Sequence, residues 1–191
     1  MASLKAFLPD MAKLFGTTAD ALYTRQRALA ELGVLKVVEG RGPGSGTPLD
    51  GSGVAAIIIA LLAADTLQDT DIRVRAFCRA TPFEDIPPDY RPGKSRKDFD
   101  RCPWTGETNL QSALAAVLMS REKAESLGSF TVHRHNNTAS LTFGRPNASF
   151  ASLFASSAPQ PRSAIRISAD IEAASIRRLA AFLQIEMAGS K

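Results

Sequence analysis

The chain begins with two short segments whose apolar residues recur at helical spacing. A glycine ends each of them. Residues 10–16 (DMAKLFG) predict a short helix that begins at Asp10 as its N-cap and ends at Gly16. Apolar residues at helical spacing then predict a second helix over 18–32, which ends before Gly33. The apolar positions of that second helix are Leu22, Leu29 and Leu32.

The next segment changes from a strand-like pattern to a glycine-rich one and then to a continuous apolar run. Residues 34–38 (VLKVV) have strand propensity and lead into the loop 39–47, EGRGPGSGT. The run at 54–64 predicts a buried helix over 51–65. It is shorter than the ~20 residues that a membrane-spanning helix needs, so we expect no contact with a membrane.

Polar and proline-rich sequence separates this part from the rest. Residues 69–79 predict either a polar helix or a short strand, and 80–107 combine prolines and charges with few aliphatic residues. Loops of that length are uncommon inside a compact domain, so we predict a linker there. A helix is expected over 108–119, continuing to Ser126.

The C-terminal part predicts a β-hairpin followed by an amphipathic helix. The alternating residues of the hairpin are Phe130, Val132 and Arg134 on the first strand and Leu141 and Phe143 on the second. Its turn is Asn136-Asn137, and a Ser/Ala/Pro-rich loop follows over 144–162. A third strand over 164–168 and a helix over 169–187 complete this part. The apolar stripe of the helix is Ile176, Leu179, Leu183 and Met187.

Residues 8–46 have the order of a winged helix-turn-helix: short helix, glycine turn, second helix, short strand, flexible tip. Two helices that cross closely need a small residue on the first helix, and Ala12 supplies it. The turn needs a positive φ, which Gly16 provides. Leu22 is placed to fill the gap between the two helices.

The stretch MAKLFGTTADALYTRQRALAELGVL resembles the helix-turn-helix of bacterial and phage regulators, loosely of the MerR type. The resemblance covers residues 8–46 only. At the position of the family's Arg-Tyr-Tyr run this chain has Tyr23-Thr24-Arg25, and its second helix is longer. The resemblance implies binding to double-stranded DNA through the second helix.

Within that frame, the outward face of helix 18–32 enters the major groove and the loop 39–47 forms a wing over the backbone. Glycines let the tip approach DNA closely, and one arginine can enter a narrow minor groove or pair with a phosphate. The predicted DNA-binding residues are Thr18, Tyr23, Thr24, Arg25, Arg27, Arg41, Gly42 and Gly44. The alternative is that Arg25 and Arg27 are solvated helix charges and that the loop is only flexible.

Charge and chemistry add little to this interpretation. The formal net charge is +4 and the pI about 9.3, which is compatible with a nucleic-acid partner without requiring one. Cys78 and Cys102 match no metal or redox spacing and are expected to be reduced thiols. His133 and His135 lack a third ligand nearby, so we expect surface histidines. We predict no enzymatic activity, no metal and no cofactor.

The predicted fold class is mostly α with a small β component. Residues 1–79 form a winged helix-turn-helix domain, 80–107 a linker, and 108–191 a small α+β domain for oligomerisation or partner binding. We expect a cytoplasmic, DNA-binding transcriptional regulator that forms homo-oligomers. The alternatives are a recognition subunit for DNA packaging or replication initiation, and a protein-interaction adaptor or anti-repressor that uses the same helical motif.

Overall fold

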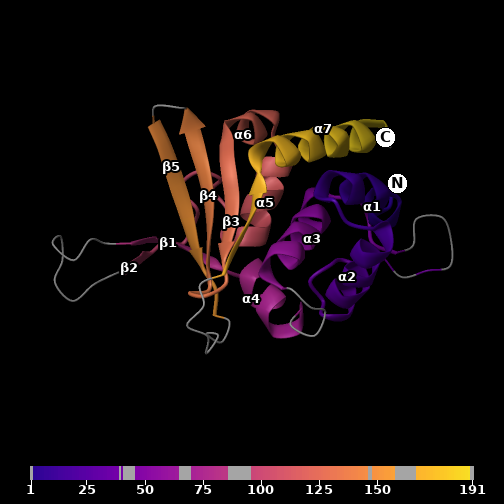
Figure 1. Cartoon of the computed structure of the whole chain (residues 1–191), viewed down its shortest axis with the longest axis horizontal. Helices are drawn as coiled ribbons and strands as arrows, with labels where there is room; N and C mark the ends of the chain where they lie inside the picture. The colour runs from indigo at the N-terminus through magenta and orange to yellow at the C-terminus, as the bar shows by residue number, and fades with distance from the viewer. Residues whose placement is uncertain are drawn as a thin grey trace.

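The computed structural model describes residues 2–38, 40, 46–64, 70–85, 96–145, 148–157 and 167–189, which form a mixed α/β fold. Helices cover one face of a six-stranded antiparallel sheet with the strand order β2-β1-β5-β4-β3-β6 (Figure 1). The helical elements are α1 (Leu4–Phe15), α2 (Ala19–Glu31), α3 (Gly51–Ala63), the π-helical turn η1 (Thr70–Val74), α4 (Arg75–Cys78), α5 (Leu110–Met119), α6 (Arg121–Ser126) and α7 (Ala173–Gly189). The strands are β1 (Thr81–Asp85), β2 (Arg96–Asp98), β3 (Leu127–His133), β4 (Thr138–Arg145), β5 (Ala148–Ala155) and β6 (Ser168–Glu172).

Helix α1 begins earlier than the sequence pattern predicted. Its N-cap is Ser3, whose side chain accepts a hydrogen bond from the backbone N–H of Ala6, and the predicted start at Asp10 is wrong. Pro9 lies inside the helix. A buried apolar face on both sides of Pro9 outweighs the backbone hydrogen bond that the proline removes. That face consists of Leu4, Phe7, Leu8, Met11 and Ala12.

The predicted glycine positions on either side of α2 are confirmed. Gly16 ends α1 in the left-handed conformation (φ 63°), and Thr18 caps α2 by accepting a hydrogen bond from the backbone N–H of Ala21. The helix ends at Glu31 with Leu32 as its C-cap, and Gly33 follows with φ 67°. These positions were predictable because each depends on local backbone geometry.

The predicted strand over 34–38 is wrong. In its place, residue 38 forms an isolated antiparallel bridge with Gly46, while Leu35 turns into the core. A second isolated bridge joins Ser3 to Pro48 and holds the returning segment beside the N-terminus. Packing of Leu35 against the helices therefore replaces strand pairing in this segment.

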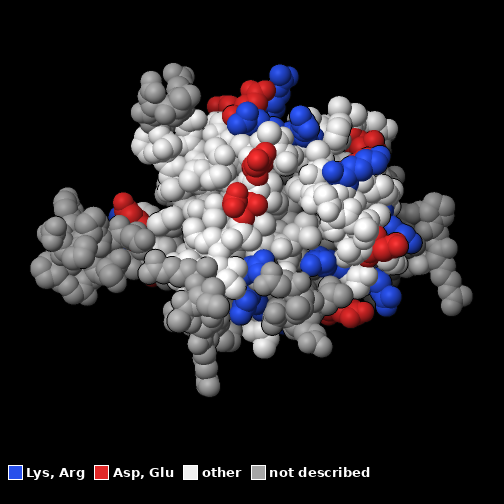
Figure 2. Space-filling view, in the orientation of Figure 1, with Lys and Arg blue, Asp and Glu red and all other residues white. Residues whose placement is uncertain are grey.

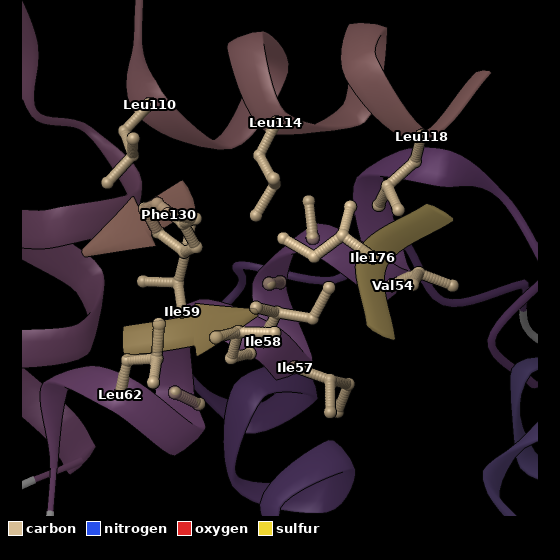
Figure 3. Packing of buried hydrophobic residues seen from close by; sticks show 14 of the residues in the cluster. Val54, Ile57, Ile58, Ile59, Leu62, Leu110, Leu114, Leu118, Phe130 and Ile176 are labelled. Atoms are coloured by element: carbon tan, nitrogen blue, oxygen red, sulfur yellow. The ribbon is translucent and has the colours of Figure 1, made fainter. Parts of the chain in front are cut away.

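Helix α3 is buried, as its uninterrupted apolar sequence predicted. All of its residues except Ser52 and Leu61 are buried, and Asp50 caps it by accepting a 2.6 Å hydrogen bond from the backbone N–H of Gly53. Figure 3 shows its isoleucines surrounded by apolar side chains of α5, β3 and α7. The labelled neighbours are Leu110, Leu114, Leu118, Phe130 and Ile176. The core cluster thus draws on both ranges predicted as separate domains, whose boundaries stay a prediction.

Two segments that looked irregular in the sequence contribute strands. β1 and β2 lie within 80–107, the range predicted as a linker, and β1 pairs with both β2 and β5. β5 lies within 144–162, where the prediction of a loop is wrong. Serine and alanine dominate its sequence, so its pairing with β4 and the burial of Phe154 determine its conformation rather than propensity.

The remaining C-terminal elements follow the prediction more closely. β3 and β4 form the expected hairpin, with Asn137 at φ 56° in its turn. The helix predicted over 108–126 is broken at Ser120, which caps α6. β6 starts at Ser168, the last residue of the strand predicted over 164–168, and residues 164–166 lie outside the described part. α7 accordingly begins at Ala173 instead of 169.

Either a helix or a strand was predicted over 69–79. Residues 70–78 are helical and form η1 and α4. Among the residues that the structure describes, the helices do not combine the length and apolar character required to cross a membrane.

Candidate nucleic-acid interface

The contact between α1 and α2 brings together the three positions on which the helix-turn-helix prediction depended. Ala12 and Leu22 are both buried, at 4% and 0% exposure. Between them, the backbone N–H of Thr17 donates to the carbonyl of Ala12 at 3.1 Å and closes the turn at Gly16. Both side chains belong to the hydrophobic core cluster of the protein.

Helix α2 exposes a polar face. Tyr23, Thr24 and Arg27 are all exposed, and residues three and four apart lie on one side of a helix. The Thr24 hydroxyl donates to the carbonyl of Asp20 at 2.9 Å, which fixes its rotamer. The ammonium of Lys5 lies 4.5 Å from the centre of the Tyr23 ring, so α1 adds a cation to this face.

The two arginines of α2 have different surroundings. Arg27 is exposed and pairs with Glu31 at 4.0 Å, one helical turn along. Arg25 is half-buried, and its Nε is enclosed without a hydrogen-bond partner among the described residues. Thr18 uses its hydroxyl oxygen to cap the helix. Arg27 is therefore the guanidinium of α2 most available to a ligand.

The base of the predicted wing lies within the described residues. The N–H groups and carbonyls of Val38 and Gly46 exchange two hydrogen bonds, of 2.9 and 2.8 Å, which bring the two ends of the glycine-rich segment together. The predicted contacts Arg41, Gly42 and Gly44 lie outside the described residues. Val38, where this bridge begins, lies six residues after Leu32, the C-cap of α2.

A second basic group lies near the end of α2 and was not predicted. Arg75 in α4 and Arg79, the C-cap of that helix one turn along, line a surface hollow of about 470 Å³ together with Leu32 at the end of α2. Figure 2 shows Lys and Arg side chains along the lower edge of the molecule, over α4 and α2, with an acidic group among them. The i,i+4 spacing in the sequence RAFCR was a signal for two arginines on one face.

The histidine pair is part of the scaffold. Nδ1 of His133 lies 2.9 Å from the hydroxyl of Ser168, and Nδ1 of His135 donates to the carbonyl of Ile167. Burial lowers the pKa of His133, and the neighbouring His135 lowers it further. In the described part of the chain, no three His, Cys, Asp or Glu side chains gather as metal ligands. The two rings therefore hold the end of β3 against the residues leading into β6.

Comparisons of this chain with models of protein families, with curated proteins and with solved structures find no match. What the surface can bind is therefore derived from its own groups. Exposed hydroxyls, a guanidinium and an ammonium on and beside one short helix are hydrogen-bond donors suited to phosphate oxygens and base edges.

Proposed function

We propose that this chain binds duplex DNA as a sequence-specific transcriptional regulator of bacterial or phage type. Helix α2 lies in the major groove, and the segment 39–47 acts as a wing beside it. One observation carries the proposal: Tyr23, Thr24 and Arg27 are exposed together on the second helix of a glycine-turned helix pair.

The exposed face has the chemistry that base and backbone contacts need. Recognition helices meet DNA with their N-terminal half, where Tyr23 and Thr24 lie. The Tyr23 hydroxyl can donate to a phosphate, and the methyl group of Thr24 can contact the methyl group of thymine. Replacing the Arg27–Glu31 ion pair by a contact with a phosphate costs little free energy, because exposed ion pairs contribute only ~0–1 kcal/mol.

Two neighbouring features extend the contact surface. The bridge between Val38 and Gly46 holds the two ends of the glycine-rich segment together. The proposed wing uses Arg41 of this segment to contact a phosphate or a minor groove. On the other side, Arg75 and Arg79 offer two charges to the DNA backbone beyond the end of α2. Backbone contacts of this kind position the protein, and α2 supplies the sequence preference.

Fluorescence anisotropy of labelled random-sequence duplexes over a salt series tests the proposal. We expect affinity that falls steeply with salt, and weaker binding by Arg27→Ala and Arg41→Ala, because each phosphate contact releases counterions. Arg121→Ala is a matched control, since Arg121 also pairs with a glutamate one turn along on an exposed helix. Its removal should leave DNA affinity unchanged.

Specificity needs a second readout, because non-specific binding alone produces the salt effect. Selection from a random duplex library should enrich one sequence in the wild type, and Tyr23→Ala or Thr24→Ala should relax that preference. Absence of binding at low salt contradicts the proposal and favours a protein-interaction role for the same helix face.

A further inference from the structure

The surface hollow at the end of α2 combines two arginines with exposed apolar side chains. Its volume is about 470 Å³, and its lining comes from η1, α4, the C-cap of α2 and the segment that follows β5. Small-molecule sites usually have volumes of about 300–1,000 Å³, so the hollow is large enough for a small ligand. The residues that line it are Leu32, Ile72, Arg75, Ala76, Arg79 and Ser157.

In the described part of the chain, the two arginines of this hollow have no carboxylate partner. Arg75 and Arg79 are both exposed, and the ion pairs between described residues join other side chains. No described Asp or Glu lines the hollow. Two like charges one helical turn apart destabilise a helix. An anion bound between the two guanidiniums relieves that repulsion and accepts charge-assisted hydrogen bonds from both.

The apolar side chains of the hollow extend this preference beyond a bare anion. Ile72 is 69% exposed, the highest value among the large apolar side chains that the structure describes. Leu32 and Ala76 are half-buried and line the same hollow. A ligand that covers these side chains removes apolar surface from water, and an inorganic anion does not. The hollow therefore suits a ligand that has an anionic group and an apolar body.

We propose that this hollow binds an organic anion with a short apolar body and one carboxylate or phosphate group. Arg75 and Arg79 hold the anionic group, while Ile72 and Leu32 contact the apolar body. The hydroxyl of Ser157, which also lines the hollow, is a further hydrogen-bond donor for the anionic group.

Isothermal titration calorimetry of the full chain without DNA tests the chemistry of the ligand. Octanoate and octyl phosphate have both parts, whereas octan-1-ol lacks the charge and acetate lacks the apolar body. We expect saturable binding of octanoate, of octyl phosphate or of both, at least roughly tenfold tighter than that of octan-1-ol or acetate. The tighter anion identifies the head group. No saturable binding of either anion at millimolar concentration, or equally tight binding of octan-1-ol, would overturn the proposal.

Variants of exposed residues test the location of the ligand. Arg75→Gln combined with Arg79→Gln should weaken binding of the tighter probe at least roughly tenfold, and Ile72→Ser should weaken it as well. The matched controls lie on α7, at the top of Figure 1, whereas α4 lies near the bottom. They are Arg178→Gln, at another exposed arginine, and Ile185→Ser, at an isoleucine that is 67% exposed. Both controls should bind the probe as the wild type does.

Far-UV circular dichroism confirms that each variant keeps its helices. Unchanged binding by the double arginine variant, or an equal loss of binding in the α7 controls, would place the ligand elsewhere and contradict the proposal.

An effect of this ligand on DNA affinity rests on the proposed function, in which the same two arginines contact the DNA backbone. The bound probe should lower the affinity of the wild type for duplex DNA and leave that of the double arginine variant unchanged. Fluorescence anisotropy with and without the probe measures this. Because the calorimetry uses no DNA, ligand binding and DNA binding can each fail alone. An unchanged DNA affinity of the wild type at saturating probe would show that the ligand and DNA do not compete for Arg75 and Arg79.

Discussion

The guanidinium of Arg134 donates a hydrogen bond from Nε to the backbone carbonyl of Leu62. Arg134 follows strand β3 and is only 5% exposed, and Leu62 lies in the last turn of α3. Helix α3 ends in an extended residue, Ala64, without a glycine cap. A buried cation here satisfies a terminal carbonyl and faces the negative end of the helix dipole.

Replacing Arg134 with methionine should therefore destabilise the protein. We expect the free energy of unfolding to fall by about 2–3 kcal/mol, because a charged hydrogen bond is lost and the carbonyl of Leu62 stays buried. Urea denaturation measures this. Arg101→Met is the matched control: Arg101 also donates to a backbone carbonyl, that of Gly106, but it is exposed, and its loss should cost less than about 0.5 kcal/mol.

The same contact joins the two ranges predicted as separate domains, so their unfolding should be coupled. Trp104, the one tryptophan of the chain, reports on the C-terminal side through its stacking on Phe143 at 4.3 Å. Far-UV circular dichroism reports mainly on the helices. We expect the two denaturation curves to coincide, because α3 belongs to one core cluster that contains residues of both ranges. Two separated transitions would show independent domains.

The sequence predicted what local backbone geometry decides. Gly16, Gly33 and the Asn137 turn were placed correctly, because each needs a positive φ that few residues adopt. The start of α1 was missed because Pro9 is a strong local signal, and only the packing of its neighbours overrides it. β5 was missed because its pairing partners lie elsewhere in the chain.

The candidate site also contains some residues that the sequence predicted and others that it did not. The exposure of Tyr23, Thr24 and Arg27 follows from the helical period of α2 alone. Lys5 and the α4 arginines could not be assigned to the site, because their position depends on how other helices pack beside α2. Arg134 continues the alternation of Phe130 and Val132, which places it on their buried face, but its contact with α3 depends on how that helix packs against the sheet.

Removing one histidine should change the titration of the other. His135→Gln should raise the pKa of His133 towards its ordinary value of 6.5, because part of the lowering comes from His135 and the larger part from burial. NMR titration of the imidazole protons measures the pKa directly. An unchanged or lower pKa of His133 in the variant would contradict the interaction of the two rings.

The lowered pKa of His133 also makes stability depend on pH. As the pH falls below about 6.5, the unfolded chain takes up a proton on this residue before the folded protein does. The free energy of unfolding should therefore decrease between the ordinary pKa and the lower pKa of the folded state. His133→Gln should reduce that decrease, as measured by thermal unfolding over the same pH range.

The thiol of Cys78 should be inert in the folded protein. Burial raises its pKa to about 12, although Arg79 lowers it slightly, so little thiolate forms near neutral pH. In a Cys102→Ala variant, Ellman's reagent should react with Cys78 only as the protein unfolds. Rapid stoichiometric labelling in native buffer would show that Cys78 is accessible.

The most direct test of DNA contact by α2 is site-specific photo-crosslinking. A photoreactive benzoylphenylalanine at Tyr23 should cross-link to duplex DNA, whereas the same group at Phe150, an aromatic residue 62% exposed on β5, should not. Cross-linking from position 23 alone is the predicted result. A cross-link from position 150 alone, or none from position 23 under conditions where the protein binds DNA, would contradict the assignment of α2 as the reading helix.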